Sequence, residues 1–224
     1  MTVLVALVLA GMQTFLEPVH SLNESVYNKR SVLLSVASLQ EKPVNSMTVQ
    51  EVQDVFDHQM EELVLDSDGN IIEGVTAGEV NLEEELKKPK SEQRYPLYIF
   101  EKDGEKYYIV SVRGQGLWDA IWGSIALESD LSTIKGASFD HAGETPGLGA
   151  EIKDDPGFPA QFVGKEIYDD NGDFTSVQVV KGMIRNPTHE VDAISGSTIT
   201  SRGVQEMLYR GIQNYEPYFE KIRK

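Results

Sequence analysis

The chain has 224 residues, of which 40% are hydrophobic and 25% are charged, and this balance excludes a collagen-like, low-complexity or wholly disordered protein. Asp and Glu number 36 against 20 Lys and Arg, which leaves a net charge of −16. This charge argues against nucleic acid as a partner, because duplex binding needs cations that replace phosphate counterions. The chain has no cysteine, so it cannot form a disulfide, a thiolate metal site or a Cys-ligated iron–sulfur cluster.

An apolar run, VLVALVLAGMQTFL, occupies residues 3–16. As a helix it would span about 21 Å, which is shorter than the roughly 30 Å hydrocarbon core of a bilayer. Three interpretations are open: the outer part of a transmembrane helix, the apolar region of a signal sequence, and a buried helix of the soluble fold. We favour the first, because no Lys or Arg precedes the run and no polar face interrupts it. Residues 1–20 are therefore expected to form a membrane-anchor helix whose start is truncated.

Residues 21–94 are expected to form an acidic subdomain that is helical or α+β. Thr48 and Glu51 make a capping-box pattern that opens a helix. The apolar face predicted for this helix consists of Val49, Val52, Phe56, Met60 and Leu63. The turn 68–70 between two apolar stretches predicts a hairpin over residues 65–75. Twelve acidic and no basic residues lie between Glu51 and Glu85, which is typical of a solvated face.

Residues 95–224 change to strand patterns and end in a helix. Two aromatic and β-branched runs flank Asp103-Gly104 and predict a two-residue hairpin. Further strands are predicted over 120–129, 133–141, 166–168, 174–180 and 190–194, with a short helix near 159–163. Apolar residues from Val204 to Ile222 recur at helical spacing. The predicted fold class is α+β: a mostly antiparallel sheet with flanking helices.

Metal sites receive no support from the residue pattern. The loops starting at Asp66 and Asp169 have alternating oxygens, but their glycines stand at the wrong position for an EF-hand, so both are interpreted as turns. The four histidines show no metal-binding spacing, and His141 is expected to be a surface or network residue rather than a ligand shared with Glu144.

The most informative segment runs from Asp192 to Ser201, where a strand ends in a hydroxyl-rich, glycine-containing turn that opens a helix. The free N–H groups and positive end of such a helix can hold a phosphate, and the hydroxyls are candidate nucleophiles. Plain helix capping would use the same residue types, so both interpretations remain open at this point.

Asp192-x-x-Ser195-Gly196-Ser197-Thr198 resembles the flavinylation motif of the FMN-binding domain family, although that family commonly has alanine where this chain has Ser197. The resemblance implies that Thr198 carries FMN through a phosphoester bond, attached by a flavin transferase that uses FAD. It also implies that Asp192 takes part in attachment. Further candidate cofactor-binding residues are Ser195, Gly196, Ser197 and Thr200, whose hydroxyls, where present, are expected to support the phosphate rather than bond to it.

Two further segments resemble the same family. The first segment runs from His141 to Gly149, and its Pro146-Gly147 pair presets a tight turn with positive φ at the glycine. The residues of this segment expected at the cofactor are Glu144, Thr145, Gly147 and Leu148. In the second, Gly114-Gln-Gly-Leu-Trp118, the indole of Trp118 is a candidate neighbour of the flavin. Core packing is the alternative for Trp118 and for Trp122.

Taken whole, the chain resembles the C subunits of Na⁺-translocating NADH:quinone reductases, a membrane family with one N-terminal helix and a flavin domain. This resemblance implies electron transfer through covalent FMN to a flavin on a neighbouring subunit. It also implies the bacterial inner membrane, a single pass, and the flavin domain on the extracytoplasmic side. The alternatives are a G subunit of the related Rnf complexes, a non-redox tethered assembly subunit, and a soluble flavin reductase with exchangeable FMN. No catalytic acid or base and no metal are required of this chain.

Overall fold

The structure, a computed structural model, describes Val5, Gly11 and residues 23–223. The expected anchor at residues 1–20 therefore lies outside the described residues except for those two positions. None of the helices in the described part has the length and apolar content required to span a bilayer.

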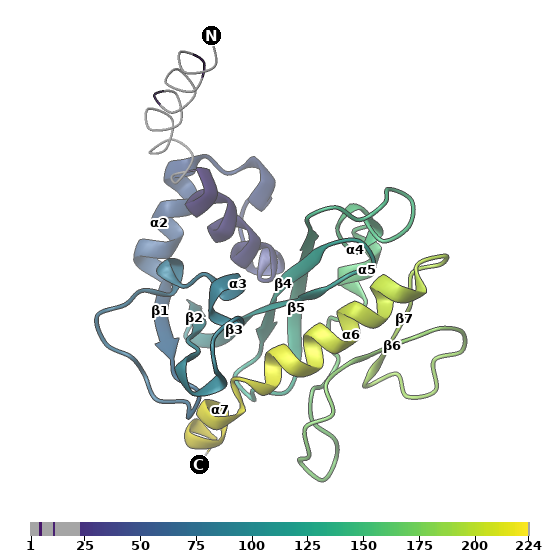
Figure 1. Ribbon diagram of the computed structural model, residues 1–224. Coiled ribbons are helices and arrows are strands. Elements are labelled where there is room, and N and C mark those ends of the chain that lie inside the picture. Colours follow the sequence, from purple (N-terminus) through teal and green to yellow (C-terminus); the bar gives the residue numbers. More distant parts are fainter. Residues whose placement is uncertain (1–4, 6–10, 12–22, 224) are drawn as a thin grey trace.

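A five-stranded antiparallel sheet forms the centre of the fold, in the order β1-β2-β3-β4-β5 (Figure 1). The strands are β1 (Met60–Leu65), β2 (Tyr95–Lys102), β3 (Glu105–Gln115), β4 (Ala120–Leu127) and β5 (Ile134–His141). A separate parallel pair joins β6 (Gln178–Val180) to β7 (Glu190–Asp192). The α+β class with a mostly antiparallel sheet is confirmed.

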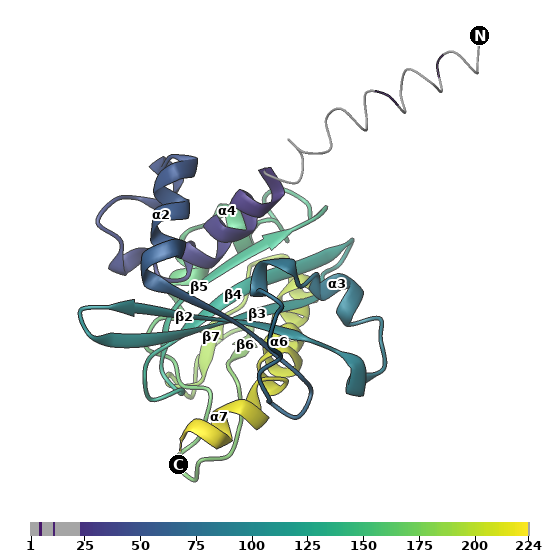
Figure 2. The ribbon, with the colours of Figure 1, turned by 90° about the vertical axis from the view of Figure 1, so that its left-hand side faces the viewer.

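Helices cover both faces of the five-stranded sheet (Figure 2). One face carries α6 (Thr198–Gln213), α7 (Glu216–Ile222), α4 (Glu151–Asp154) and α5 (Gly157–Ala160). The other face carries the helical residues 23–34 and α2 (Val49–Gln59). The remaining short helices are η1 (Ala37–Leu39), η2 (Val44–Ser46), η3 (Ala77–Glu79), α3 (Leu82–Glu85) and η4 (Lys90–Glu92).

Side-chain alternation along β3 divides the interior into two cores. Val110 and Val112 pack into the core beneath α6, whereas Tyr107 and Ile109 pack into the core beneath α2. Successive strand residues point to opposite faces, so a strand covered on both sides carries buried apolar residues at adjacent positions, as Ile109 and Val110 do. The packing of α6 along β3 brings the first turn of α6 to the same end of the sheet as the loops that follow β3 and β5.

The predicted hairpin between β2 and β3 is confirmed. Asp103 and Gly104 have φ angles of 56° and 82°, as a two-residue type I′ turn requires. The capping box is confirmed as well, because Glu51 N donates to the Thr48 hydroxyl at 3.2 Å and Thr48 N donates to the Glu51 carboxylate at 2.6 Å.

The helix predicted through Leu63 ends earlier, at Gln59. Residues 60–65 instead pair with β2, with Met60 opposite Phe100 and Leu63 opposite Leu97. Long-range pairing therefore overrides the local helical spacing. The hairpin predicted over 65–75 is reduced to a single bridge between Leu65 and Ile71. The expected division at residue 94 falls between β1 and β2, which are neighbours in one sheet, and the subdomain division itself stays a prediction.

The strands predicted between residues 166 and 180 are largely replaced by irregular backbone. Only single bridges occur at Glu166 and Tyr168, and three residues of the predicted strand 174–180 form β6. The backbone N–H groups of Thr175 and Ser176 both donate to Ile167 O, so these groups are satisfied without a ladder. The short helix predicted at 159–163 corresponds to α5, which begins at Gly157, and the predicted C-terminal helix divides into α6 and α7.

Candidate functional site

Three motif segments that are far apart in the sequence meet at the carboxylate of Glu144, which is only 5% exposed. Its Oε1 atom accepts a hydrogen bond from the backbone N–H of Trp118 at 2.9 Å. Its Oε2 atom accepts a hydrogen bond from the Thr200 hydroxyl at 2.5 Å. One side chain therefore joins the loop after β5, the loop after β3 and the first turn of α6.

The surroundings of Glu144 favour its charged form. Burial by itself raises the pKa of this carboxyl, but hydrogen bonds from Thr200 and from the Trp118 and Asp119 backbone lower it, and the pKa lies below the ordinary value.

Glu144 N donates to His141 Nδ1 at 3.2 Å, which makes His141 the network residue that the sequence predicts. The part of the chain that the structure describes contains no cluster of three metal-binding side chains.

The loop over residues 144–149 forms the tight turn predicted from Pro146-Gly147. Gly147 has a φ of +75°, and Leu148 N donates to Thr145 O at 3.1 Å. Gly149 is required for a different reason: a Cβ atom there would overlap Glu144 Oε2 and would lie 2.7 Å from the Thr200 hydroxyl oxygen. The absence of a side chain at Gly149 therefore lets the loop close onto α6.

In the first turn of α6, some of the hydroxyl residues are buried and others are exposed. Thr198 is the first residue of the helix and its side chain is exposed, whereas Thr200 and Ser201 are buried. Ser197 occupies the N-cap position, but its side chain makes no capping hydrogen bond. Capping by Ser197 therefore does not account for this motif. Because the helix starts at Thr198, its first N–H groups have no intrahelical acceptors.

Each of the three segments that meet at Glu144 carries an exposed large apolar side chain. Trp118 is 67% exposed, Leu148 is 41% exposed and Ile199 is 58% exposed. The Trp118 indole N–H donates to the Thr145 hydroxyl at 3.1 Å. A Cβ atom at Gly196 would lie 2.9 Å from Leu148 Cδ2, so the Leu148 side chain rests against the motif. Core packing is thus the wrong interpretation of Trp118, and these residues form an exposed apolar surface.

Trp122 does not share this surface. Its ring is half-buried, and the Arg113 guanidinium lies over it at 5.3 Å from the ring centroid.

Two predicted residues lie apart from the Glu144 cluster. Asp192 ends β7, where its N–H donates to the side-chain oxygen of Gln161 at 2.8 Å. Ser195 is exposed in the turn before α6. Gln161 was missed by the sequence analysis, because its contact with Asp192 spans 31 residues and leaves no local pattern. Arg202, which was not singled out from the sequence, is exposed on α6 four residues after Thr198.

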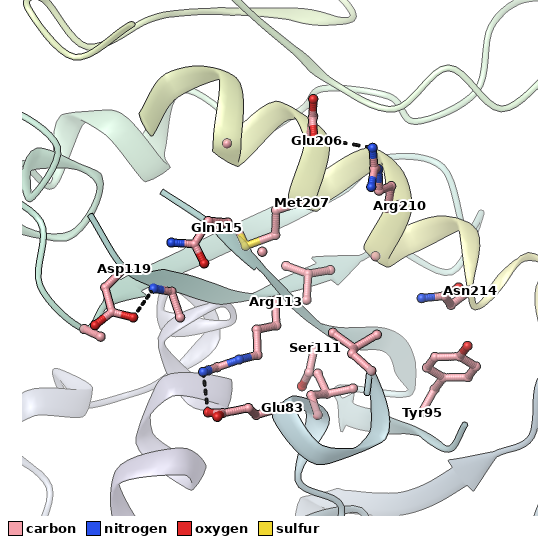
Figure 3. A pocket seen from close by; sticks show the side chains of 18 residues that line it. Glu83, Tyr95, Ser111, Arg113, Gln115, Asp119, Glu206, Met207, Arg210 and Asn214 are labelled. Carbon is pink, nitrogen blue, oxygen red and sulfur yellow. Dashed lines mark hydrogen bonds and ion pairs between the residues drawn. The ribbon is translucent and has the colours of Figure 1, made fainter. Parts of the chain in front are cut away.

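A groove of about 680 Å³ lies along the other side of α6, between this helix, β3 and α3 (Figure 3). Both of its arginines face carboxylates: Arg113 pairs with Glu83 at 2.6 Å, and Arg210 pairs with Glu206 at 3.5 Å. Thr198 does not line this groove. The groove therefore offers no unpaired cation for a phosphate, and the exposed turn at Thr198 is the better candidate site.

Comparisons with known proteins point to the same region. The family model described as FMN-binding domain matches residues 116–213, which contain Trp118, Glu144 and the 192–198 motif. Among the solved structures, the C subunit of the Na(+)-translocating NADH-quinone reductase from Parabacteroides distasonis is 35% identical with a TM-score of 0.79, covering 91% of this chain and 96% of that one. The NqrC structure from Shewanella oneidensis is 26% identical with a TM-score of 0.75, covering 90% of this chain and 98% of that one.

A sequence relative supports this similarity over the whole chain. The C subunit of the Na(+)-translocating NADH-quinone reductase of Pseudomonas aeruginosa is 32% identical over 100% of this chain and 95% of its own length. That coverage includes the segments outside the FMN-binding match, so the similarity is not confined to the flavin motif. On this evidence, the chain belongs to the family of C subunits of Na⁺-translocating NADH-quinone reductases.

Proposed function

We propose that this chain carries FMN bound covalently to Thr198 and relays electrons within a membrane Na⁺-translocating NADH:quinone reductase. The observation that carries the proposal is the exposed Thr198 hydroxyl at the first position of a long helix, beside an exposed apolar surface. Bound FMN would supply the reversible uptake and release of electrons, while the protein holds and orients it. The chain acts as a subunit, and no NADH-binding fingerprint occurs in its sequence.

Attachment requires a reachable hydroxyl and a cradle for the phosphate. The Thr198 oxygen forms a bond to the FMN phosphorus of FAD, the pyrophosphate bond breaks, and AMP leaves with the hydroxyl proton. The free N–H groups of the first turn then face the phosphoester, and the positive end of α6 stabilises its charge. Exposed Asp192 and Ser195 are available to the flavin transferase that performs this step, as the family motif implies.

Arg202 supplies the counter-charge that the sequence analysis did not identify. A phosphoester on Thr198 keeps one negative charge, and Arg202 lies one turn along the same helix face. Helical side chains lean toward the N-terminus, so the Arg202 guanidinium can reach a phosphoester on Thr198. In the described part of the chain Arg202 forms no salt bridge, unlike Arg210, which pairs with Glu206.

The exposed apolar side chains around Thr198 fit a flat ring system. Leu148 and Ile199 offer aliphatic surface, and the indole of Trp118 is oriented by its hydrogen bond to Thr145. Covering these side chains with the isoalloxazine would remove apolar area from water, which favours a bound ring over a solvated one. Trp118 and Leu148 are therefore proposed as ring neighbours.

Mutation of the acceptor tests the linkage directly. The chain is incubated with a matching flavin transferase, FAD and Mg²⁺, and the FMN adduct is measured by intact mass and peptide mapping. Thr198→Ala should abolish the adduct, whereas Thr198→Ser should keep part of it because the attacking oxygen remains. Ser195→Ala and Ser197→Ala serve as matched controls and should still be modified. An adduct on Thr198→Ala, or one mapped to Ser197 in the unmutated chain, contradicts the assignment.

The proposed location is the bacterial inner membrane, with a single pass through residues 1–20 and the flavin domain on the extracytoplasmic side. The family resemblance and the apolar run at residues 3–16 support this placement. The protein expressed from its native gene should sediment with membranes and resist an alkaline wash. Deletion of the residues before Leu22 should release a flavin-bearing domain. Release of the undeleted protein by alkaline wash would count against the anchor.

A further inference from the structure

We infer that Glu144, acting through Thr200, fixes the rotation of the first turn of α6 and thereby keeps the Thr198 hydroxyl turned outward. Glu144 is a positioning residue in this account and does not touch the flavin. The inference deepens the proposed function and rests on it, because it concerns how the acceptor hydroxyl is presented.

Helix geometry couples the two threonines. Successive residues turn by about 100°, so two residues apart in a helix point in nearly opposite directions. Thr200 is fully buried and its hydroxyl is bound to Glu144, while Thr198 is exposed. Holding Thr200 inward therefore holds Thr198 outward.

The first turn of α6 depends on this contact more than an ordinary helix start does. Its N-cap residue, Ser197, provides no side-chain hydrogen bond, although such caps normally stabilise the first turn. The other side-chain tether is the Ser201 hydroxyl, which accepts a hydrogen bond from Ile194 N at 3.1 Å. That bond holds the turn before the helix but does not involve Thr198 or Thr200.

Glu144 is itself held by the sheet. Its second carboxylate oxygen accepts from Trp118 N, and this residue belongs to the short connection between β3 and β4. The carboxylate thus connects the acceptor helix to the most extensively paired strands of the fold. The Thr145 hydroxyl lies in the same loop but accepts its hydrogen bond from the exposed Trp118 indole rather than from α6, so it offers a matched comparison.

The first test measures amide hydrogen exchange in the flavin-free protein, with the first intrahelical bond of α6 as the probe. Ser201 N donates to Ser197 O at 3.0 Å in that bond. Removal of a hydrogen bond to a charged group should speed exchange at Ser201 roughly tenfold or more in Glu144→Ala and in Thr200→Val. Thr200→Ser keeps the hydroxyl and should exchange at close to the unmutated rate. Thr145→Val, the matched control, should leave this amide unchanged.

The second test measures the initial rate of FMN attachment by intact mass, with the same transferase, FAD and Mg²⁺. Glu144→Ala and Thr200→Val should each slow attachment roughly tenfold, because each removes the hydrogen bond between Thr200 and Glu144. The Glu144→Ala/Thr200→Val double variant should be no slower than the slower single variant, because both changes remove one bond. Thr200→Ser should restore the rate.

Two results would overturn the inference: unchanged Ser201 exchange in Thr200→Val, or additive losses in the double variant. Thr200→Val removes only the hydroxyl and keeps the side-chain shape, so it decides the question if Glu144→Ala fails to fold. A failure of the proposed function is a separate outcome. The unmutated chain would then accept no FMN on Thr198, whereas the exchange measurement needs no flavin.

Discussion

Gly149→Ala tests the close approach between the loop after β5 and α6. The φ angle of Gly149 lies outside the left-handed region, so alanine fits the backbone there. The added Cβ atom, however, would overlap Glu144 Oε2 and would lie 2.7 Å from the Thr200 hydroxyl oxygen. The substitution therefore acts on the contact between Glu144 and Thr200 rather than on the loop backbone.

The expected cost follows from that contact. Displacing the carboxylate weakens a charge-assisted hydrogen bond worth about 1.5–3 kcal/mol. Overpacking in a well-packed interior costs a further 1–3 kcal/mol or so, and the two effects overlap because they share the same atoms. We expect the free energy of unfolding to fall by about 3 kcal/mol, which lowers the melting temperature of a chain of this size by about 6–12 °C.

Gly147→Ala is the matched control, two residues away in the same loop. Gly147 has a φ of +75°, but a Cβ atom there would meet no other atom within 4 Å. Its cost is the left-handed backbone alone, about 1–2 kcal/mol. Urea unfolding of both variants, analysed at a common m-value, gives the comparison. A Gly149→Ala variant that is no less stable than Gly147→Ala would refute the reasoning.

Three further predictions concern Glu85, Tyr215 and Trp118. Glu85 is buried and accepts hydrogen bonds from Arg94 at 2.7 and 3.0 Å, so Glu85→Ala should lower the free energy of unfolding by about 2 kcal/mol in urea titrations, because charge-assisted hydrogen bonds are lost while the partly exposed Arg94 stays hydrated. Burial raises the pKa of the Glu85 carboxyl, but the hydrogen bonds from Arg94 and Lys88 together bring the pKa below its ordinary value. The stabilisation from Glu85 is therefore present above about pH 4.3, the unfolded pKa, and is lost as the pH falls through the folded pKa. An acid titration as steep in Glu85→Ala as in the unmutated chain would contradict this. Tyr215→Phe should cost about 1–2 kcal/mol in the same urea assay, because the buried hydroxyl is hydrogen-bonded to the backbone of β2 and β3; an unchanged midpoint would argue against it. Trp118→Ala should leave the melting temperature within about 2 °C, since an exposed side chain stabilises little, but should change the absorbance of attached FMN; an unchanged spectrum would remove Trp118 from the flavin surroundings.

Local chemistry made several features of this fold predictable from sequence. Asp103-Gly104 predicted its hairpin because both residues tolerate positive φ, and Thr48 with Glu51 predicted a helix start because they satisfy each other's backbone donors. The turn at Gly147 belongs to the same class. These signals act within four residues, so they do not depend on the rest of the fold.

The strand and helix patterns likewise predicted the α+β class, and the motif resemblance predicted the FMN-binding family. The separate segments around Trp118, Glu144 and Thr198 could be identified one by one in this way. Their mutual arrangement could not, because spacing along a chain does not report contacts across a sheet.

Only the tertiary structure decided which motif residues are buried and which are exposed. Glu144 and Thr200 lie beneath the surface and bind each other across 56 residues, while Trp118, Leu148 and Thr198 remain exposed above them. Pairing between distant segments likewise explains why Met60–Leu65, which was predicted to continue a helix, forms a strand beside β2. In both cases the deciding energy comes from burial and from hydrogen bonds between distant segments, and a local pattern contains neither.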